Sequence, residues 1–484
     1  MFRTVVLVHR YVGIALGLLM AMWCLSGVVM MYVPYPQLTD EQRIAGLQSI
    51  DWKGCCQLGE SATSAPAAGP ISDNTSVSSF QLEMLGDRPV LRAALVGSGR
   101  RVIDLRTGAM IESVSDEDAL LAAELVAKSM GVVGPPRALG LITRDQWTVG
   151  FGRGERPLHE FAFDDPARTV LYVSNVSGKA IQVTRSSQRF WNWLGSVPHW
   201  LYPTVLRQHP AVWSQVVIWA SAIGVFLTAI GLYLGIVELR RRSDGKLSSP
   251  HRGIMYWHHV PGLVFGVLVV SWTLSGLFSM NPWGMMETQR IGEDMEALSG
   301  EPPRWAEVSN LIELLASRAP EKIRSVSSAP FGGELFAIAS TATGERLRLD
   351  AHGLAKPLAK DELDAAAARL LQDSPRSSWG MLGTEDAYYY GTSRQPAMLP
   401  VVRFVSDGEH AVRYYLDPVS GRLVNKVDDG SRSFRWWHSA LHTFDFSAFT
   451  RSAWFRNALM LPLLLGAALV CVTGVWIGIR RLTR

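Results

Sequence analysis

Four long apolar segments stand out along this chain of 484 residues. They lie within residues 1–33, 212–238, 254–280 and 454–484. A helix of about 20 apolar residues is long enough to cross a hydrocarbon core about 30 Å thick. The sequence therefore predicts four membrane-spanning helices, in which helix 1 is followed by a long polar segment and helix 3 by another.

The two long segments, 34–211 and 281–453, carry a different pattern. Short alternating runs at 102–105, 170–173 and 414–416 each end in a turn signal, which is typical of β-hairpins. Helical patterns lie between them at about 116–130, 307–317 and 360–372. Each long segment is predicted to be a small α+β domain, and the Ala-, Ser-, Gly- and Pro-rich stretch 61–79 is predicted to be a linker.

Composition supports a membrane protein. Hydrophobic residues make up 48 % of the chain and its mean hydropathy is +0.11. The net charge is +4, and no basic cluster lies away from the apolar segments, so nucleic-acid binding has little support. The first segment has an apolar run longer than that of a secretory signal and no small-x-small cleavage site before Pro34, so it is interpreted as a retained helix.

Basic residues around the apolar segments predict the orientation. They gather before helix 1, in the short loop 239–253 and after helix 4, at Arg3, Arg10, Arg240, Arg241, Arg242, Lys246, Arg252, Arg480, Arg481 and Arg484. Under the positive-inside rule these regions are cytoplasmic. Both termini are then expected in the cytoplasm, and both α+β domains on the other side of the membrane.

The sequence also repeats itself. At a constant offset of 249, helix 1 matches helix 3, with His9 opposite His258 and the Trp-x-Leu-Ser-Gly run from Trp23 opposite that from Trp272. At an offset of 243 the second part of each half matches, as in Pro157/Pro400, Phe161/Phe404, Arg189/Arg432, Trp193/Trp436, His199/His442, Gly231/Gly474 and Gly235/Gly478. Both halves begin on the same side of the membrane, so the chain is predicted to consist of two parallel repeats.

Several of these motifs resemble the PepSY-associated transmembrane proteins of bacteria, over nearly the whole chain. The resemblance rests on His-x3-Gly-x3-Gly with the later Trp-x-Leu-Ser-Gly, on RYYLDPVSGRL, and on FWNWLGSVPHWLYP and FRWWHSALHTFDF. It implies a multi-pass protein of the bacterial inner membrane with two periplasmic PepSY-like domains. Some members of this family are similar to haem-containing reductases that release iron from siderophores, and others have no assigned activity.

The histidines of the predicted helices are the first candidates for chemistry, because a metal-ligating side chain in a membrane helix is costly. Each is followed by glycines at i+4 and i+8 on the same helix face, namely Gly13 and Gly17 after His9, and Gly262 and Gly266 after His258. Such a face leaves room for a flat macrocycle whose iron the imidazole ligates. It is also typical of close helix packing, which needs no cofactor. The glycines alone favour packing, whereas the paired histidines together with the family resemblance favour haem.

A second pair, His199 and His442, precedes helices 2 and 4 among many aromatic residues. The four histidines are expected at two different depths in the membrane and therefore form two layers. We therefore predict two b-type haems, an inner one ligated by His9 and His258 and an outer one ligated by His199 and His442, with the four glycines facing the inner haem. Iron with two axial imidazoles is suited to electron transfer. His438 and His259 lack histidine counterparts in the repeat, and both are interpreted as replacement or supporting ligands.

The leading hypothesis is a membrane oxidoreductase that moves electrons from an inner donor, quinol or a redox partner protein, to a periplasmic acceptor, with a ferric siderophore expected. No zinc-protease, nucleophile-elbow, Walker or Rossmann motif is found, so hydrolysis and direct NADPH oxidation have little support. Two alternatives stay open: a cofactor-free PepSY scaffold or regulator of a periplasmic protein, and a transporter for iron or copper. The neighbouring Cys55 and Cys56 are candidates for a vicinal disulfide or a redox role.

Overall fold

The computed structural model describes residues 2–58, 71–150, 152–241, 243–288, 291–371, 378–391, 396–407 and 411–483. The chain divides into two compact units. The helical unit comprises Met1–Tyr35, Ser187–Thr288 and Asp429–Arg484. The sheet unit comprises Pro36–Ser186 and Gln289–Asp428. Each unit therefore draws on both halves of the sequence repeat.

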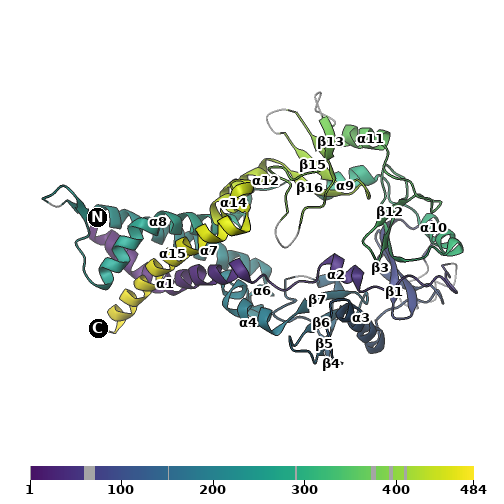
Figure 1. Cartoon of the computed structure of the whole chain (residues 1–484), viewed down its shortest axis with the longest axis horizontal. Coiled ribbons are helices and arrows are strands. Elements are labelled where there is room, and N and C mark those ends of the chain that lie inside the picture. The colour runs from purple at the N-terminus through teal and green to yellow at the C-terminus, as the bar shows by residue number, and fades with distance from the viewer. Residues whose placement is uncertain are drawn as a thin grey trace. The chain divides into compact units, whose positions relative to one another are not determined.

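Among the described residues, four helices are long and apolar enough to cross a membrane, as many as the sequence predicted, and all lie in the helical unit. They are α1 (Phe2–Tyr32), α7 (Pro210–Val237), α8 (Ile254–Phe278) and α15 (Ala453–Leu482). Both α1 and α8 pack against α7 and α15, so α1 and α8 occupy opposite corners of the bundle (Figure 1). Both chain termini lie at the same end of the bundle as the α7–α8 connection, which holds the short strands β8 (Arg240–Arg241) and β9 (Leu247–Ser248) (Figure 1).

Short helices precede α7 and α15. They are α4 (Ser186–Leu194), α5 (Ser196–His199) and α6 (Thr204–Arg207) in the first half, and α12 (Asp429–Phe434), the π-helix η4 (Arg435–Ala440), α13 (Leu441–Thr443) and α14 (Ala448–Arg451) in the second. The first half breaks its helix at Gly195, where a Cβ atom would lie 3.0 Å from Val29 Cγ1 and 3.2 Å from the Trp191 carbonyl oxygen. The second half continues through the π-helix instead. Helix α5 ends at His199, and His442 is the middle residue of α13.

The centre of the sheet unit is a six-stranded antiparallel sheet. Its order is β12 (Arg346–Leu349), β11 (Ala337–Thr341), β10 (Ile323–Ser328), β1 (Val77–Leu85), β2 (Arg88–Leu95) and β3 (Gly99–Asp104). Strands β1 and β10 pair Leu82 with Val326 and Glu83 with Ser325. The β1–β2 pair Phe80/Ala93 and the β10–β11 pair Val326/Ala339 match at an offset of 246. At that offset Gln81 corresponds to Ser327, its own partner, so a local pseudo-twofold axis passes through this pair.

Two four-stranded antiparallel sheets complete the sheet unit. One contains β4 (Pro136–Ile142), β5 (Leu158–Phe163), β6 (Val170–Ser174) and β7 (Ala180–Thr184), and the other β13 (Ser378–Leu382), β14 (Val401–Val405), β15 (Arg413–Leu416) and β16 (Leu423–Val427). The helices are α2 (Asp40–Ala45), α3 (Asp116–Ser129), α9 (Ile291–Ser299), α10 (Trp305–Arg318) and α11 (Lys360–Leu370). The structure confirms, within a few residues, the predicted strands at 170–173 and 414–416 and the three predicted helices of these segments. Residue 372, the predicted end of the last helix, lies outside the described residues, and so does much of the predicted linker.

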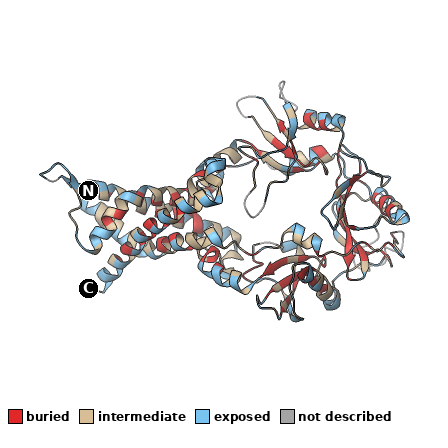
Figure 2. Ribbon diagram, viewed as in Figure 1, coloured by how far each residue is buried: buried red, intermediate tan, exposed pale blue. Residues whose placement is uncertain are grey.

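Apolar faces of the helices cover the sheets. Helix α10 buries Val308, Leu311, Ile312 and Leu315, which recur at helical spacing, against the central sheet. Helix α3 likewise buries Ala119, Ala123 and Val126 in one cluster with residues of β5 and β6. Figure 2 shows the buried positions concentrated along the strands.

The central sheet differs from the expectation of one separate domain in each of 34–211 and 281–453. Strands β1–β3 come from the first segment and β10–β12 from the second, and they form one continuous sheet. Without β10, the inner edge of β1 would present unpaired backbone groups. The β1–β10 ladder satisfies these groups and joins the two halves.

A buried carboxylate reinforces this junction. Glu83 on β1 is 1 % exposed, and its carboxylate lies 2.9 Å from Arg43 and 3.1 Å from Arg92. The Ser325 hydroxyl of the other half donates to the same carboxylate at 3.2 Å. Burial raises the pKa of Glu83, but Arg43, Arg92 and Lys179 outweigh it, so the pKa is lowered overall.

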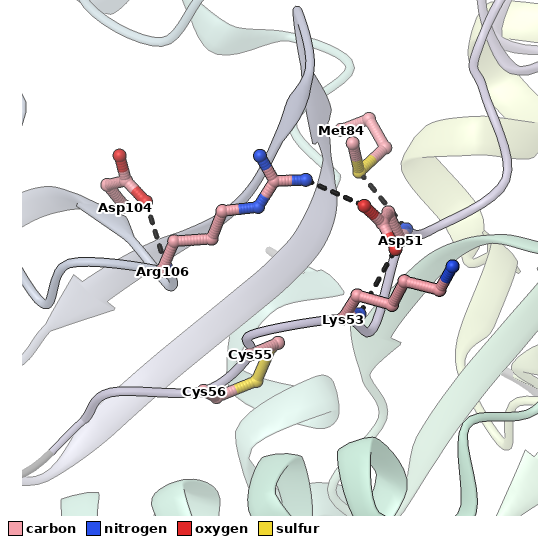
Figure 3. The surroundings of a disulfide bond; sticks show 7 residues. All are labelled: Asp51, Lys53, Cys55, Cys56, Met84, Asp104 and Arg106. Carbon is pink, nitrogen blue, oxygen red and sulfur yellow. Dashed lines mark hydrogen bonds and ion pairs between the residues drawn. A yellow bond between two sulfur atoms is a disulfide. The ribbon is translucent and has the colours of Figure 1, made fainter.

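Cys55 and Cys56 form a vicinal disulfide in the segment between α2 and β1 (Figure 3). Both cysteines pack against the core beneath α10. The segment is also held by Asp51, which accepts hydrogen bonds from Arg106 at 2.7 Å and from the Lys53 backbone N–H at 3.1 Å. The disulfide therefore belongs to a segment that is anchored on the central sheet.

Candidate functional site: two histidine pairs in the helical bundle

The four repeat-related histidines meet in two pairs. The rings of His9 on α1 and His258 on α8 have their centroids 6.4 Å apart. The rings of His199 on α5 and His442 on α13 have theirs 6.1 Å apart. Each pair thus joins one histidine from each half, in the combination that the sequence repeat predicted.

The two pairs lie at different depths. His199 Nδ1 is 3.1 Å from the carbonyl oxygen of Trp23, and Trp23 follows His9 by 14 residues on α1. At about 1.5 Å per residue, this places the His199 layer about 21 Å from the His9 layer along the helix. The pair His9/His258 lies at the end of the bundle with the chain termini, and the pair His199/His442 lies toward the other end.

Hydrogen bonds at Nδ1 hold the first pair. His9 Nδ1 is 3.3 Å from the Leu227 carbonyl oxygen, and His258 Nδ1 is 3.0 Å from the Val470 carbonyl oxygen. Leu227 and Val470 correspond at the repeat offset of 243. Thr473 adds a hydroxyl 3.3 Å from His258 Nδ1. The two contacts are therefore the same contact, made once in each half.

The second pair is held in the same way by the Trp-x-Leu-Ser-Gly motifs. His199 Nδ1 is 3.1 Å from the Ser26 hydroxyl, and His442 Nδ1 is 3.0 Å from the Ser275 hydroxyl. Burial lowers the pKa of His199 to about 4 and that of His442 to about 3. Both imidazoles are consequently neutral at pH 7.

These hydrogen bonds determine which ring nitrogen of each histidine keeps a free lone pair. A backbone carbonyl only accepts hydrogen bonds, so a neutral imidazole bound to it through Nδ1 carries its proton there and keeps a lone pair on Nε2. Within the described residues, no hydrogen bond is made to Nε2 of His9, His258, His199 or His442. All four side chains can thus offer Nε2 to a metal.

The spacing within each pair fits one metal ion between two imidazoles. An imidazole nitrogen binds a first-row metal at about 2 Å, so two rings on opposite sides of one ion have centroids about 6 Å apart. The observed separations are 6.4 and 6.1 Å. Haem is compatible with this spacing, and the two imidazoles of each pair would hold its iron.

Glycines leave room beside the first pair, but not the glycines that the spacing suggested. A Cβ atom at Gly231 on α7 would lie 2.6 Å from His9 Cε1, and one at Gly474 on α15 would lie 3.1 Å from His258 Cε1. Gly231 and Gly474 correspond in the repeat, which is the signal that could have identified them.

The predicted glycines pack against apolar side chains of neighbouring helices. A Cβ atom at Gly13 or Gly17 would lie 3.8 Å from Leu227 or 3.4 Å from Val475. One at Gly262 or Gly266 would lie 4.0 Å from Val470 or 3.1 Å from Leu232. These contacts agree with the alternative of close helix packing.

His438 and His259, the two candidate histidines without a histidine counterpart in the repeat, lie in different surroundings. His438 lies beside the second pair, with its ring 5.1 Å from that of His442 and its Nδ1 2.9 Å from the Ser275 carbonyl oxygen. His259 has hydrogen bonds at both ring nitrogens, to the Ser249 hydroxyl at 2.8 Å and the Gly235 carbonyl at 2.9 Å. His438 therefore adjoins the second pair, whereas His259 is engaged elsewhere.

Trp23 and Trp272 contribute an unsatisfied donor each. Their indole nitrogens are buried and have no hydrogen-bond partner among the described residues. A buried donor without a partner costs about 1–3 kcal/mol. A bound group with acceptor atoms at this level would remove that cost, which again fits a cofactor beside the second pair.

A comparison with models of known protein families finds no match to this chain, and a comparison with curated proteins finds none either.

Proposed function

We propose that the protein is a di-haem b oxidoreductase of the bacterial inner membrane, related to the PepSY-associated transmembrane proteins. His9 and His258 would ligate one haem, and His199 and His442 the other. One observation carries the proposal: four buried or half-buried imidazoles form two pairs, each held through Nδ1 by repeat-related contacts, with Nε2 free.

The protein's own residues would set the properties of both sites. Haem held by these histidines would supply one-electron transfer. The carbonyls of Leu227 and Val470 and the hydroxyls of Ser26 and Ser275 fix the ring orientations, and hydrogen bonding at Nδ1 raises the basicity of the ligating nitrogen.

The proposed direction of transfer depends on the orientation that the charges predict. Basic residues gather at both termini and in the α7–α8 connection, which all lie at one end of the bundle (Figure 1). Under the positive-inside rule this end is cytoplasmic. Electrons would then enter from quinol or a redox partner protein near the His9/His258 pair and leave from the His199/His442 pair. The sheet unit, as a pair of PepSY-like domains, would lie in the periplasm.

The proposed acceptor is a ferric siderophore. One electron reduces the chelated iron from the ferric to the ferrous state, and hard oxygen ligands hold the ferrous ion less tightly. The reduction therefore releases iron without breaking a covalent bond of the chelator. It requires no hydride donor, and the sequence has no motif for a nicotinamide nucleotide.

Reduced-minus-oxidised absorbance spectra of the purified full-length protein test this proposal. We expect a Soret band, sharp α and β bands after dithionite, and two haems per chain. His9→Ala and His258→Ala should remove the same haem, and His199→Ala and His442→Ala the other, whereas His352→Ala, at an exposed position of the sheet unit, should remove none.

The possible outcomes separate the alternatives. A folded but colourless protein would refute the haem proposal and leave the PepSY scaffold or regulator and the metal transporter. Loss of different haems by the two members of a pair would refute the pairing. A haem protein that fails to reduce ferric siderophores would keep the cofactors and exclude the proposed acceptor.

A further inference from the structure

A third group of metal-ligating side chains lies in the helical unit, next to the first histidine pair, because His259 directly follows His258. Glu238 ends α7, His251 lies just before α8, and His259 lies on α8. One ligand atom from each of the three lies within 4.8 Å of the others. From this juxtaposition, we propose that Glu238, His251 and His259 bind one divalent transition-metal ion of the zinc class, independently of haem.

The hydrogen bonds around the group leave nitrogen lone pairs available. The Gly235 carbonyl at 2.9 Å accepts from His259 Nε2–H, so His259 Nδ1 carries a lone pair, which meets the Ser249 hydroxyl at 2.8 Å. Ser249 also accepts the backbone N–H of His251 at 3.2 Å. Such contacts fix the tautomer and orientation of a ligating histidine.

The Glu238–His251 contact is the place where a metal would replace a proton. His251 Nε2 lies 2.6 Å from a Glu238 carboxylate oxygen, and the two side chains are 25 % and 31 % exposed. Two ligands of one tetrahedral zinc ion lie about 3.3 Å apart at bonds of about 2 Å. The carboxylate and the imidazole therefore need only a small separation, with release of the shared proton.

The donor set selects the kind of ion. Two imidazole nitrogens and one carboxylate oxygen suit zinc and its neighbours among the divalent transition metals, whereas calcium and magnesium prefer oxygen ligands throughout. Three protein ligands leave a fourth position, which water or the adjacent Ser249 hydroxyl can fill. Because His259 is buried and the other two residues are half-buried, the ion would be accessible from one side.

The site belongs to the junction of the two repeats and has no counterpart elsewhere in the chain. At the repeat offsets, Glu238 corresponds to Arg481, His251 to Phe2 and His259 to Arg10. A metal here would connect the end of α7 to the start of α8. We therefore expect it to stabilise the bundle by about 2.7 kcal/mol at a free concentration one hundred times the dissociation constant.

Zinc binding by the full-length protein in detergent micelles tests the proposal. After removal of metals with EDTA, the protein should take up one zinc ion per chain, measured by elemental analysis after desalting, and its thermal unfolding should shift upward with zinc. Glu238→Gln and His251→Ala should weaken zinc binding at least tenfold, while His352→Ala, at an exposed histidine, should bind as the parent does. His259→Ala should also lose zinc.

Circular dichroism of each variant shows whether it is folded, and the parent protein alone is decisive if a variant is not. The proposal is overturned if the metal-free parent takes up no stoichiometric zinc, or if the folded Glu238 and His251 variants retain it. Uptake that His352→Ala abolishes would identify adventitious surface binding and would also overturn it. Because zinc and haem are measured separately, failure here leaves the haem proposal untouched.

Discussion

Replacing Gly231 with alanine would place a methyl group 2.6 Å from Cε1 of His9. Carbon atoms in ordinary contact are separated by about 3.5 Å, so the imidazole or α7 must move by about 0.9 Å. Among the residues that the structure describes, Nδ1 of the imidazole has one hydrogen-bond partner, the Leu227 carbonyl oxygen at 3.3 Å, on the same helix as Gly231. The substitution therefore displaces His9 relative to the group that orients it.

The expected magnitude has two parts. Overpacking of this kind costs about 1–3 kcal/mol. Alanine in place of glycine within a helix returns up to about 1 kcal/mol of stability. The unfolding free energy should therefore fall by no more than about 2 kcal/mol. Haem affinity at the His9/His258 site receives no such compensation, because the displacement acts directly on a ligand, and should fall by about 5-fold to 150-fold.

Haem titration of the stripped protein, followed by absorbance, measures this loss, and the low-spin bands report whether both imidazoles still bind. Gly13→Ala is the matched control, because it lies on α1 with His9 but its Cβ would meet Leu227 at an ordinary 3.8 Å. It should bind haem as the parent does. The reasoning is refuted if Gly231→Ala binds both haems normally, or if Gly13→Ala is the more damaging change.

Two further predictions concern hydrogen bonds and a buried charge. Ser275→Ala removes the hydroxyl 3.0 Å from His442 Nδ1 and should weaken only the second haem, about tenfold by haem titration; equal loss at both haems would contradict it. Glu83→Gln leaves two arginines without their buried carboxylate and should lower the free energy of unfolding by about 3 kcal/mol, measured by thermal unfolding. The control Glu334→Gln, at an exposed position, should lower it by less than about 0.5 kcal/mol. Because the pKa of Glu83 is lowered in the folded protein, its contribution to stability is present above the ordinary carboxyl pKa of about 4.3 and is lost as the pH falls. If the melting temperature of Glu83→Gln falls with acid as much as that of the parent, this explanation is wrong.

The sequence was sufficient for the helices and for the pairing of the histidines. The apolar runs are long enough to be read without tertiary information, and the two offsets match His9 with His258 and His199 with His442. The repeat also predicted local elements, because β5 and β14 begin at positions separated by the same offset of 243. These features depend on periodicity and internal symmetry alone.

The sequence did not show which helices and strands lie next to each other. Spacing places Gly13 on the same face as His9, but it does not say which helix covers that face, and the structure places Leu227 there. The pairing of β1 with β10 joins residues more than 240 positions apart, and no local signal specifies it. His259 was noticed only as a neighbour of His258, although its side chain lies with Glu238 and His251.

The antiparallel β1–β10 ladder, with its axis at the Gln81–Ser327 pair, has a consequence for the origin of the chain. It is the kind of self-complementary contact by which two identical subunits form a symmetric dimer. A half-length chain with one such strand and one histidine for each layer would complete both histidine pairs only by associating with a second copy. Fusion of two such chains would turn that dimer into an intramolecular arrangement and free each half to diverge. An obligate homodimer could not acquire a difference on one subunit alone. Two such differences are His438, which corresponds to Gly195 in the other half, and the group of Glu238, His251 and His259 at the fusion point.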